Sequence, residues 1–150
     1  MAIEVVQLPD GRIVPDYHVI RLPDYALVYA QMQDGTVPMI RQYKHGARRV
    51  CLTFPGGAIA DGEAPLDAAR RELLEETGCA ATDWLSLGAF VTNANQGCNT
   101  AHLFRATGCH RVSDPCSGDL EEMSLLYLDP VSLLKRTALD EIGLAAHVAL

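Results

Sequence analysis

The chain has 150 residues, 49% of them hydrophobic and 21% charged, so it can bury the core of one domain. Its net charge of −7 argues against a general nucleic-acid binder, which needs a basic surface. No run of about 18 apolar residues occurs, and no basic stretch followed by an apolar core opens the chain, so we expect neither a membrane span nor a secretory signal.

The five cysteines indicate a reducing compartment. Their number is odd and no Cys-x-x-Cys pair occurs, which argues against a disulfide framework and against a zinc site. We therefore expect small, mostly buried free thiols and a cytoplasmic protein. No repeat, low-complexity tract or linker divides the sequence, so residues 1–150 are predicted to form a single domain.

The first half of the chain has the pattern of short strands joined by tight turns. Asp10-Gly11 and Asp34-Gly35 each lie between two β-rich runs, which is a signal for a β-hairpin. The predicted strands are 3–8, 12–22, 25–32, 36–43 and 50–54. The last of them ends at Pro55-Gly56-Gly57, where the chain must turn.

A helix is predicted from about residue 63 to residue 77. Pro65 suits its first turn, where a missing N–H costs nothing, and Gly78 suits a left-handed residue that ends it. The apolar stripe expected to face the core consists of Leu66, Ala69 and Leu73.

Further strands and a second helix follow. The predicted strands are 84–91, 100–107 and 123–128. Asp129-Pro130 has the pattern of an N-cap followed by the first helical residue, so one or two short C-terminal helices begin there. This order of elements predicts an α/β fold, in which helices cover the faces of a mixed sheet.

Glu72, Glu75 and Glu76 form an acidic cluster at the end of the predicted helix. Like charges one turn apart repel by roughly 0.2–0.5 kcal/mol per pair. The helix dipole disfavours each negative charge in the last turn by about 0.3–1 kcal/mol. These costs are small but all unfavourable, so the cluster calls for a reason other than helix stability.

Two explanations of the cluster are open. It is either a solvated acidic face balanced by Arg70 and Arg71, with Asp67 and Arg71 as a favourable pair, or a binding site for a cation. The preceding turn favours the second, because the backbone at Gly56-Gly57 has no side chains to block it. Carboxylate and carbonyl oxygens together suit a hard cation such as Mg²⁺.

The spacing of this region resembles the signature of the Nudix hydrolases. The matching positions are Gly57, Glu63, Arg71-Glu72-Leu73, Glu75-Glu76 and Gly78-Cys79, with Cys79 where an aliphatic residue is usual. The resemblance implies a Nudix-type α/β/α sandwich with a mixed sheet, N-terminal β-hairpin strands and one catalytic helix at about 63–77. It also implies Mg²⁺-dependent hydrolysis of the pyrophosphate bond in a nucleoside diphosphate linked to another group, giving a nucleoside monophosphate and a phosphorylated remainder.

The same resemblance implies roles for individual residues. The implied metal ligands, for Mg²⁺ or alternatively Mn²⁺, are Glu72, Glu76 and the Gly56 carbonyl. Glu75 either shares the metal site or holds a metal-bound water. Arg71 orients these carboxylates together with Glu63.

A second stretch of sequence resembles one particular group within this family. The residues MIRQYKHGARRV, ahead of the Pro-Gly-Gly turn, resemble the ADP-ribose pyrophosphatase group, which implies ADP-ribose or a related substrate. Members often form homodimers through the N-terminal region, and they carry a further glutamate on a later loop. The first candidate for that catalytic and metal-binding residue is Glu121, with Glu122 and Asp119 as alternatives. Thr53 departs from the group, because many relatives have glutamate there.

Substrate contacts are expected from four further positions. Arginine binds phosphate bidentately, and polar loops between strands often bind ligands. The candidates are Arg41, Gly57, Arg49 and Asn99. Two alternatives remain open: another nucleotide substrate (a nucleoside triphosphate, dinucleoside polyphosphate or nucleotide sugar), or a regulator that binds a nucleotide without hydrolysing it.

Overall fold

The computed structural model describes residues 1–116, 118, 123–138, 141–142 and 147. The strands are β1 (Ala2–Gln7), β2 (Ile13–Val19), β3 (Tyr25–Met32), β4 (Val37–Lys44), β5 (Arg49–Thr53), β6 (Gly56–Ala58), β7 (Cys79–Ala80), β8 (Asp83–Val91), β9 (Thr100–Arg111) and β10 (Met123–Leu128). The helices are α1 (Pro65–Thr77) and α2 (Pro130–Ala138).

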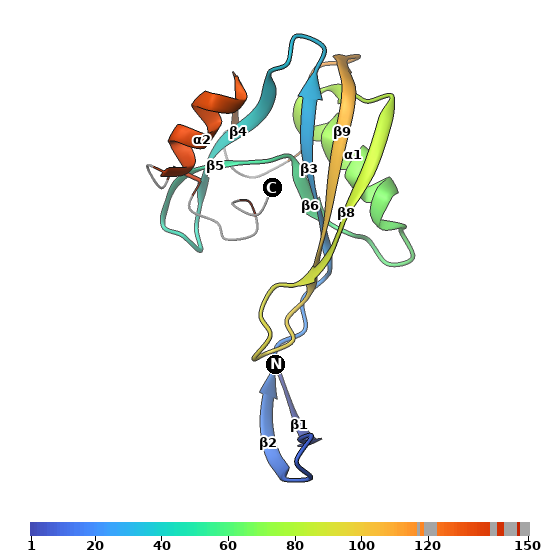
Figure 1. Cartoon of the computed structure of the whole chain (residues 1–150), viewed down its shortest axis with the longest axis vertical. Helices are drawn as coiled ribbons and strands as arrows, with labels where there is room; N and C mark the ends of the chain where they lie inside the picture. The colour runs from blue at the N-terminus through green and yellow to red at the C-terminus, as the bar shows by residue number, and fades with distance from the viewer. Residues whose placement is uncertain (117, 119–122, 139–140, 143–146, 148–150) are drawn as a thin grey trace.

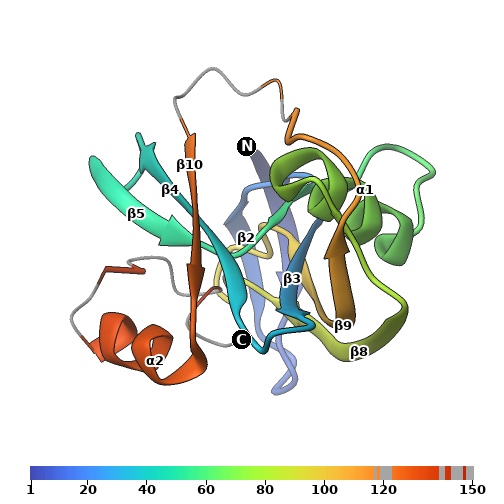
Figure 2. The ribbon, with the colours of Figure 1, turned by 90° about the horizontal axis from the view of Figure 1, so that it is seen from above.

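Two sheets form the body of the molecule, with α1 on one side and α2 on the other (Figures 1 and 2). The larger sheet has the order β6-β3-β9-β7, and β8 also pairs with β9. It is mixed, because β3 and β9 run parallel whereas its other pairings are antiparallel. The smaller sheet, β10-β4-β5, is antiparallel. This is the predicted α/β/α architecture.

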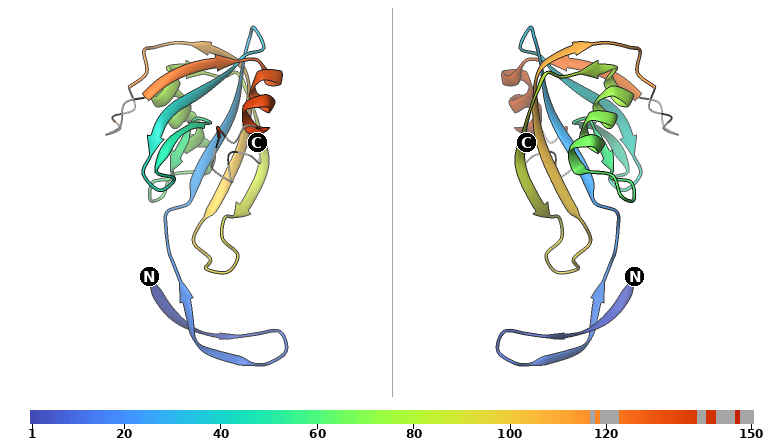
Figure 3. Two further views of the ribbon diagram at one scale, coloured as in Figure 1. Left: turned by 90° about the vertical axis from the view of Figure 1, so that its left-hand side faces the viewer. Right: turned by 90° about the vertical axis from the view of Figure 1, so that its right-hand side faces the viewer.

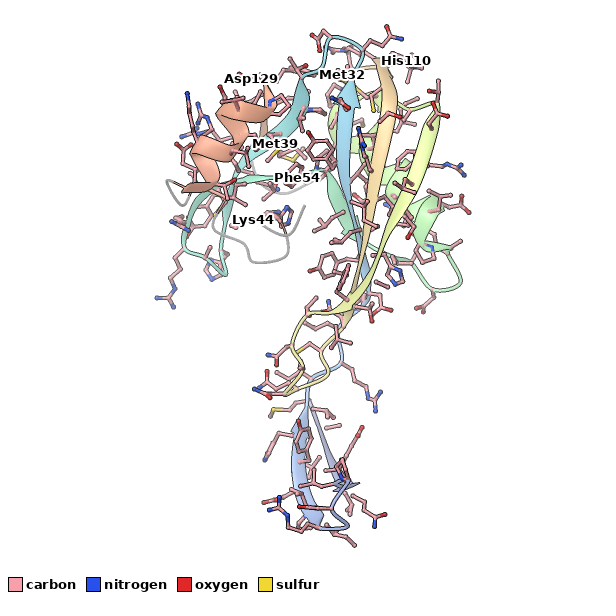
Figure 4. All side chains as sticks on the ribbon, viewed as in Figure 1. Met32, Met39, Lys44, Phe54, His110 and Asp129 are labelled. Atoms are coloured by element: carbon pink, nitrogen blue, oxygen red, sulfur yellow. The ribbon has the colours of Figure 1, made fainter. Side chains whose placement is uncertain are left out.

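Each helix covers an apolar core. Between α1 and the larger sheet lie buried side chains that include Ala26, Val28, Ala69, Leu73 and Phe104. Leu66 packs against this cluster, so the predicted apolar stripe of α1 is confirmed. A second core, beside the smaller sheet and α2, contains Val37, Met39, Leu52, Phe54, Leu133 and Ile142. Figure 4 labels Met39 and Phe54, which belong to this second core.

The two Asp-Gly turns form as predicted, but only the first joins two strands of one sheet. Gly11 and Gly35 both have φ 86°, and each turn closes with backbone hydrogen bonds. After the first turn β1 and β2 pair as a hairpin, which extends away from the body (Figures 1 and 3). The predicted hairpin at Asp34-Gly35 is wrong beyond the turn: β3 enters the larger sheet and β4 the smaller one, where each finds other partners.

The helix termini largely follow the sequence signals. α1 begins at Pro65, two residues after the predicted start, and ends at Gly78, which has φ 69° and donates its N–H to the Leu74 carbonyl at 2.8 Å. The Asp129 side chain accepts the Ser132 N–H at 3.0 Å, which confirms the N-cap of α2. No helix in the described part of the chain is long and apolar enough to cross a membrane.

Gly78→Ala tests the end of α1. A Cβ at Gly78 would lie 2.2 Å from the Ser113 carbonyl oxygen, whereas one at Gly35, also left-handed, meets nothing within 4 Å. We expect Gly35→Ala to lower the free energy of unfolding by about 1 kcal/mol through backbone strain alone. Gly78→Ala adds a backbone clash and should cost about 3 kcal/mol or more. Equal urea midpoints for the two variants would contradict this account.

Candidate active site

The site is formed where the loop after β5 meets α1. β6 pairs with β3, which places Gly56 opposite Leu27 and Gly57 opposite Ala26. A Cβ at Gly56 would lie 2.2 Å from the Ala26 carbonyl oxygen, and one at Gly57 would lie 2.4 Å from Glu72 Oε1. Glycine is therefore required at Gly56 by the backbone of β3, whereas a side chain at Gly57 would displace the Glu72 carboxylate.

Glu76 binds the same loop directly. The Gly56 N–H donates a hydrogen bond of 2.7 Å to Glu76 Oε2. The Glu76 residue is only 7% exposed, so its carboxylate reaches the loop from inside the protein. Glu72 and Glu76, one helical turn apart, thus approach two consecutive residues of one backbone segment.

Arg71 lies at the centre of the remaining carboxylates. Its Nε and Nη2 atoms donate to both oxygens of Glu63, each at 2.9 Å. Nη1 donates to Glu72 Oε1 at 2.6 Å and to Glu75 Oε2 at 3.2 Å. Nη2 also donates to the Ala58 carbonyl at 3.0 Å, which ties the guanidinium to the loop. Arg71 therefore binds three glutamates, Glu63, Glu72 and Glu75, at the same time.

The predicted pair of Asp67 with Arg71 is not formed. Asp67 instead accepts a hydrogen bond of 3.3 Å from Arg70, and the Arg71 side chain turns toward the loop. The reason is geometric, because Glu63 offers both oxygens to the planar guanidinium and a bidentate pair is stronger than one contact. Glu63 lies before the helix, where it also accepts the Ala60 N–H at 2.9 Å.

These contacts shift the titration of the pair. Hydrogen bonds from Arg71, and then from the Ala60 N–H, lower the pKa of Glu63 to about 2. The hydrogen bond with Glu63, assisted by Glu72, raises the pKa of Arg71 above its ordinary value, against an opposing effect of burial. Both groups therefore stay charged at neutral pH, and the cation offsets part of the repulsion among the glutamates.

A cleft of about 1000 Å³ opens beside this network. One wall is the segment between β2 and β3, another is the loop between β6 and α1, and Arg71 and Glu72 lie in it. The first wall is held in place by Asp24, whose side chain accepts the Thr100 N–H at 2.7 Å and whose carbonyl accepts the Ile59 N–H at 2.8 Å.

Several residues that line the cleft were missed from the sequence. They are Arg21, Asp24 and Asp61. A Pro-Asp dipeptide marks a loop at 23–24, but no local signal says that this loop lies beside the segment that leads into α1. The contact depends on the pairing of β3 with β6 and β9, which the sequence pattern alone does not reveal.

The predicted substrate-binding residues lie at different distances from this cleft. Gly57 lies beside Glu72, which lines the cleft, and Asn99 donates a hydrogen bond of 2.9 Å to the carbonyl of Pro23, a wall residue. Arg41 on β4 and Arg49 on β5 are exposed and do not line the cleft.

Other predicted positions have simpler outcomes. Glu121 and its alternatives Glu122 and Asp119 lie outside the described residues. Thr53 is 2% exposed, donates its hydroxyl to the Ile40 carbonyl at 3.3 Å and accepts from Gln42 at 3.4 Å. Its polar group is thus satisfied within the smaller sheet.

The oxygen donors at α1 fit a hard divalent cation. Among the described residues no three Asp, Glu, His or Cys side chains converge as a ready set of ligands. Mg²⁺ does not need such a set, because it is commonly bound by one or two carboxylates together with water and substrate phosphate. Glu72 and Glu76, with the bare backbone at Gly56 and Gly57, offer oxygen ligands of that kind.

Comparison with known proteins assigns the family. The model of the NUDIX domain matches residues 21–142, and the chain belongs to this family. The crystal structure of an ADP compounds hydrolase superposes with a TM-score of 0.79 over 97% of this chain and 78% of its own. Its sequence identity is 19%, so this likeness concerns the fold alone.

Two relatives of comparable sequence identity have names that describe different activities. The ADP-ribose pyrophosphatase of Bacillus subtilis is 31% identical over 104 residues, which are 69% of this chain and 56% of the relative. The methanol dehydrogenase activator of Bacillus methanolicus is 28% identical over 144 residues, 95% of this chain and 74% of the relative. The chain therefore spans little more than half the length of the first.

Glu63→Gln tests the ion pair with Arg71 through its pH dependence. The folded-state pKa of Glu63, about 2, lies below the ordinary value of 4.5. The pair therefore stabilises the folded protein fully above pH 4.5, and this contribution is lost as the pH falls toward 2. In urea unfolding we expect the variant to be less stable than the wild type at pH 7 and the difference to shrink by pH 3. A difference independent of pH would contradict the assignment.

Proposed function

We propose that this protein hydrolyses the pyrophosphate bond of a nucleoside diphosphate linked to another group, with ADP-ribose or a related compound as substrate. The observation that carries the proposal is the joint approach of Glu72 and Glu76 to Gly57 and Gly56, beside a cleft of about 1000 Å³. That volume suits a small-molecule ligand of this size.

In the proposed reaction a water oxygen forms a bond to one phosphorus, and the bond from that phosphorus to the bridging oxygen breaks. Mg²⁺, or alternatively Mn²⁺, would neutralise phosphate charge and promote ionisation of the attacking water. Glu72, Glu76 and the Gly56 carbonyl are the proposed ligands. The residues themselves supply a fixed arrangement of charge, which is the main source of catalysis in phosphoryl chemistry.

Glu75 and Arg71 have distinct proposed roles. The Glu75 side chain is 42% exposed, so it can reach a water molecule at the site and accept its proton. Arg71 holds Glu75 at 3.2 Å and Glu72 at 2.6 Å, which limits their motion before the reaction. Glu121 remains the proposed loop carboxylate, and Arg41, Arg49 and Asn99 remain proposed substrate contacts.

The name of the Bacillus subtilis relative, ADP-ribose pyrophosphatase, supports this choice of substrate class. A cytoplasmic location is part of the proposal and rests on the cysteines, all five of which are free thiols. The name of the Bacillus methanolicus relative, methanol dehydrogenase activator, favours the alternative of a regulator that binds a nucleotide without hydrolysing it. Metal-dependent turnover separates the two.

We further propose that the protein is a homodimer. The β1–β2 hairpin projects from the body, and a two-stranded sheet by itself is marginally stable in water (Figure 3). Its side chains Ile3, Val5 and Ile13 are 64%, 70% and 65% exposed. Contact with a second copy would bury these side chains.

A substrate panel tests the proposed reaction. The purified protein is incubated with Mg²⁺ and ADP-ribose, nucleotide sugars, dinucleoside polyphosphates or nucleoside triphosphates, and products are followed by chromatography. We expect AMP and ribose 5-phosphate from ADP-ribose. Faster turnover of another compound would replace the substrate but keep the reaction. The absence of turnover across the panel would favour the regulator.

Glu76→Gln tests the metal ligand. The amide oxygen can still accept the Gly56 N–H, so we expect the free energy of unfolding to change by less than about 1 kcal/mol. Loss of the negative charge should lower kcat by at least about 100-fold. Asp67→Asn, on the same helix but paired with Arg70, is the control and should keep full activity. Unchanged turnover in Glu76→Gln would refute this role.

Ile3→Asp with Val5→Asp tests the dimer. We expect the double variant to be monomeric by light scattering after size-exclusion chromatography, whereas the wild type is dimeric. Val131→Asp, at a 61% exposed position on α2, is the control and should stay dimeric. A monomeric wild type would contradict the proposed dimer without affecting the proposed chemistry.

A further inference from the structure

Three consecutive residues of the site loop are held by three different parts of the chain. The Phe54 N–H donates to His147 Nδ1 at 3.0 Å. The Pro55 carbonyl accepts the N–H of Val28, on β3, at 2.9 Å. The Gly56 N–H donates to Glu76 of α1 at 2.7 Å. The path of the loop toward the carboxylates thus depends on a residue near the C-terminus, as well as on the sheet and the helix.

His147 also packs against the residue to which it is bonded. The rings of His147 and Phe54 are stacked, with centroids 6.3 Å apart and planes at 9°. Phe54 in turn contacts Tyr29 of β3, at 5.8 Å between centroids. His147 and Phe54 share a cavity of about 290 Å³ with side chains of α2. Figure 4 labels Phe54, and the ring is part of the second core.

The histidine is in the correct form to accept this hydrogen bond. Burial, with a smaller effect from Lys44, lowers the pKa of His147 to about 4. The ring is therefore neutral at physiological pH, and because Nδ1 accepts, its proton is on Nε2.

We propose that His147 is a positioning residue for the active site, which acts by holding the Phe54 N–H and so directing Gly56 and Gly57 against Glu76 and Glu72. The loop is short, and Gly57 lies so near Glu72 that a Cβ there would be 2.4 Å from Glu72 Oε1. A shift of about 1 Å at Phe54 would therefore be passed on to both carboxylate contacts. Misplacement of this size can lower catalysis by about 10²-fold. The effect on turnover rests on the proposed function, whereas the effect on the loop does not.

Two variants separate the hydrogen bond from the packing. His147→Phe keeps an aromatic ring on Phe54 but removes the acceptor. His147→Asn places an amide oxygen near the position of Nδ1 and so can restore it. Leu133→Ala is the control, because Leu133 lines the same cavity and is 6% exposed but does not bond to the loop. It should lower stability without altering the loop.

The first measurement is hydrogen exchange of the backbone amides of Phe54, Gly56 and Gly57. We expect at least about tenfold faster exchange in His147→Phe, and rates within about threefold of the wild type in His147→Asn and Leu133→Ala. Should His147→Phe fail to fold, His147→Leu takes its place. Unchanged exchange in a folded variant without the acceptor would overturn the proposal, as would equally fast exchange in Leu133→Ala.

The second measurement concerns the site itself. We expect His147→Phe to weaken Mn²⁺ binding and to lower kcat by about tenfold or more, with KM nearly unchanged, because the cleft walls at 21–24 and 58–62 are separate from His147. His147→Asn should recover most of kcat. A wild type that turns over nothing would refute the proposed function, while the exchange experiment would still decide the role of His147. A rise in KM with constant kcat would count against positioning.

Discussion

The repulsion among negative charges at the end of α1 is the constraint on which the site depends. Glu72, Glu75 and Glu76 lie together where the helix dipole also disfavours them. The positive charge of Arg71 offsets part of this repulsion, because its side chain binds Glu63, Glu72 and Glu75 at the same time. Because Glu63 belongs to the loop before the helix, the same cation also fastens that loop to α1.

The backbone of β6 forms the other side of the site, opposite the carboxylates of α1. β6 is a strand of three residues, yet it holds the loop so close to β3 and α1 that a methyl group at Gly56 would collide with the Ala26 carbonyl and one at Gly57 would displace the Glu72 carboxylate. Glu72 and Glu76 approach glycine residues, which have no side chains. The distance between α1 and the loop is therefore set by the pairing of β6 with β3. Interactions remote from the chemistry, at Phe54 and Val28, therefore contribute to the geometry of the site.

Local patterns in the sequence predicted much of this structure. The amphipathic stripe, Pro65 and Gly78 locate α1 to within two residues. The contact between Arg71 and Glu63 was expected only from the resemblance to the Nudix signature. Features that depend on pairing between segments far apart in the sequence were not predicted. They are the separation of β3 from β4 into two sheets, the strands β6 and β7, and the cleft wall formed by residues 21–24. The role of His147 has no local signal, because it arises from a contact across the fold.

The parallel pairing of β3 with β9 has a consequence for folding. It joins Tyr25 to Ala101, and the whole of α1 with its acidic cluster lies in the segment between them. Closing so long a loop is entropically costly and makes a slow, cooperative step. Before that step the larger sheet lacks its central pairing, and α1 has no completed surface to pack on. Because residues of β3, β9 and α1 share one core, the surface that supports the charged cluster is complete only when β3 and β9 are paired.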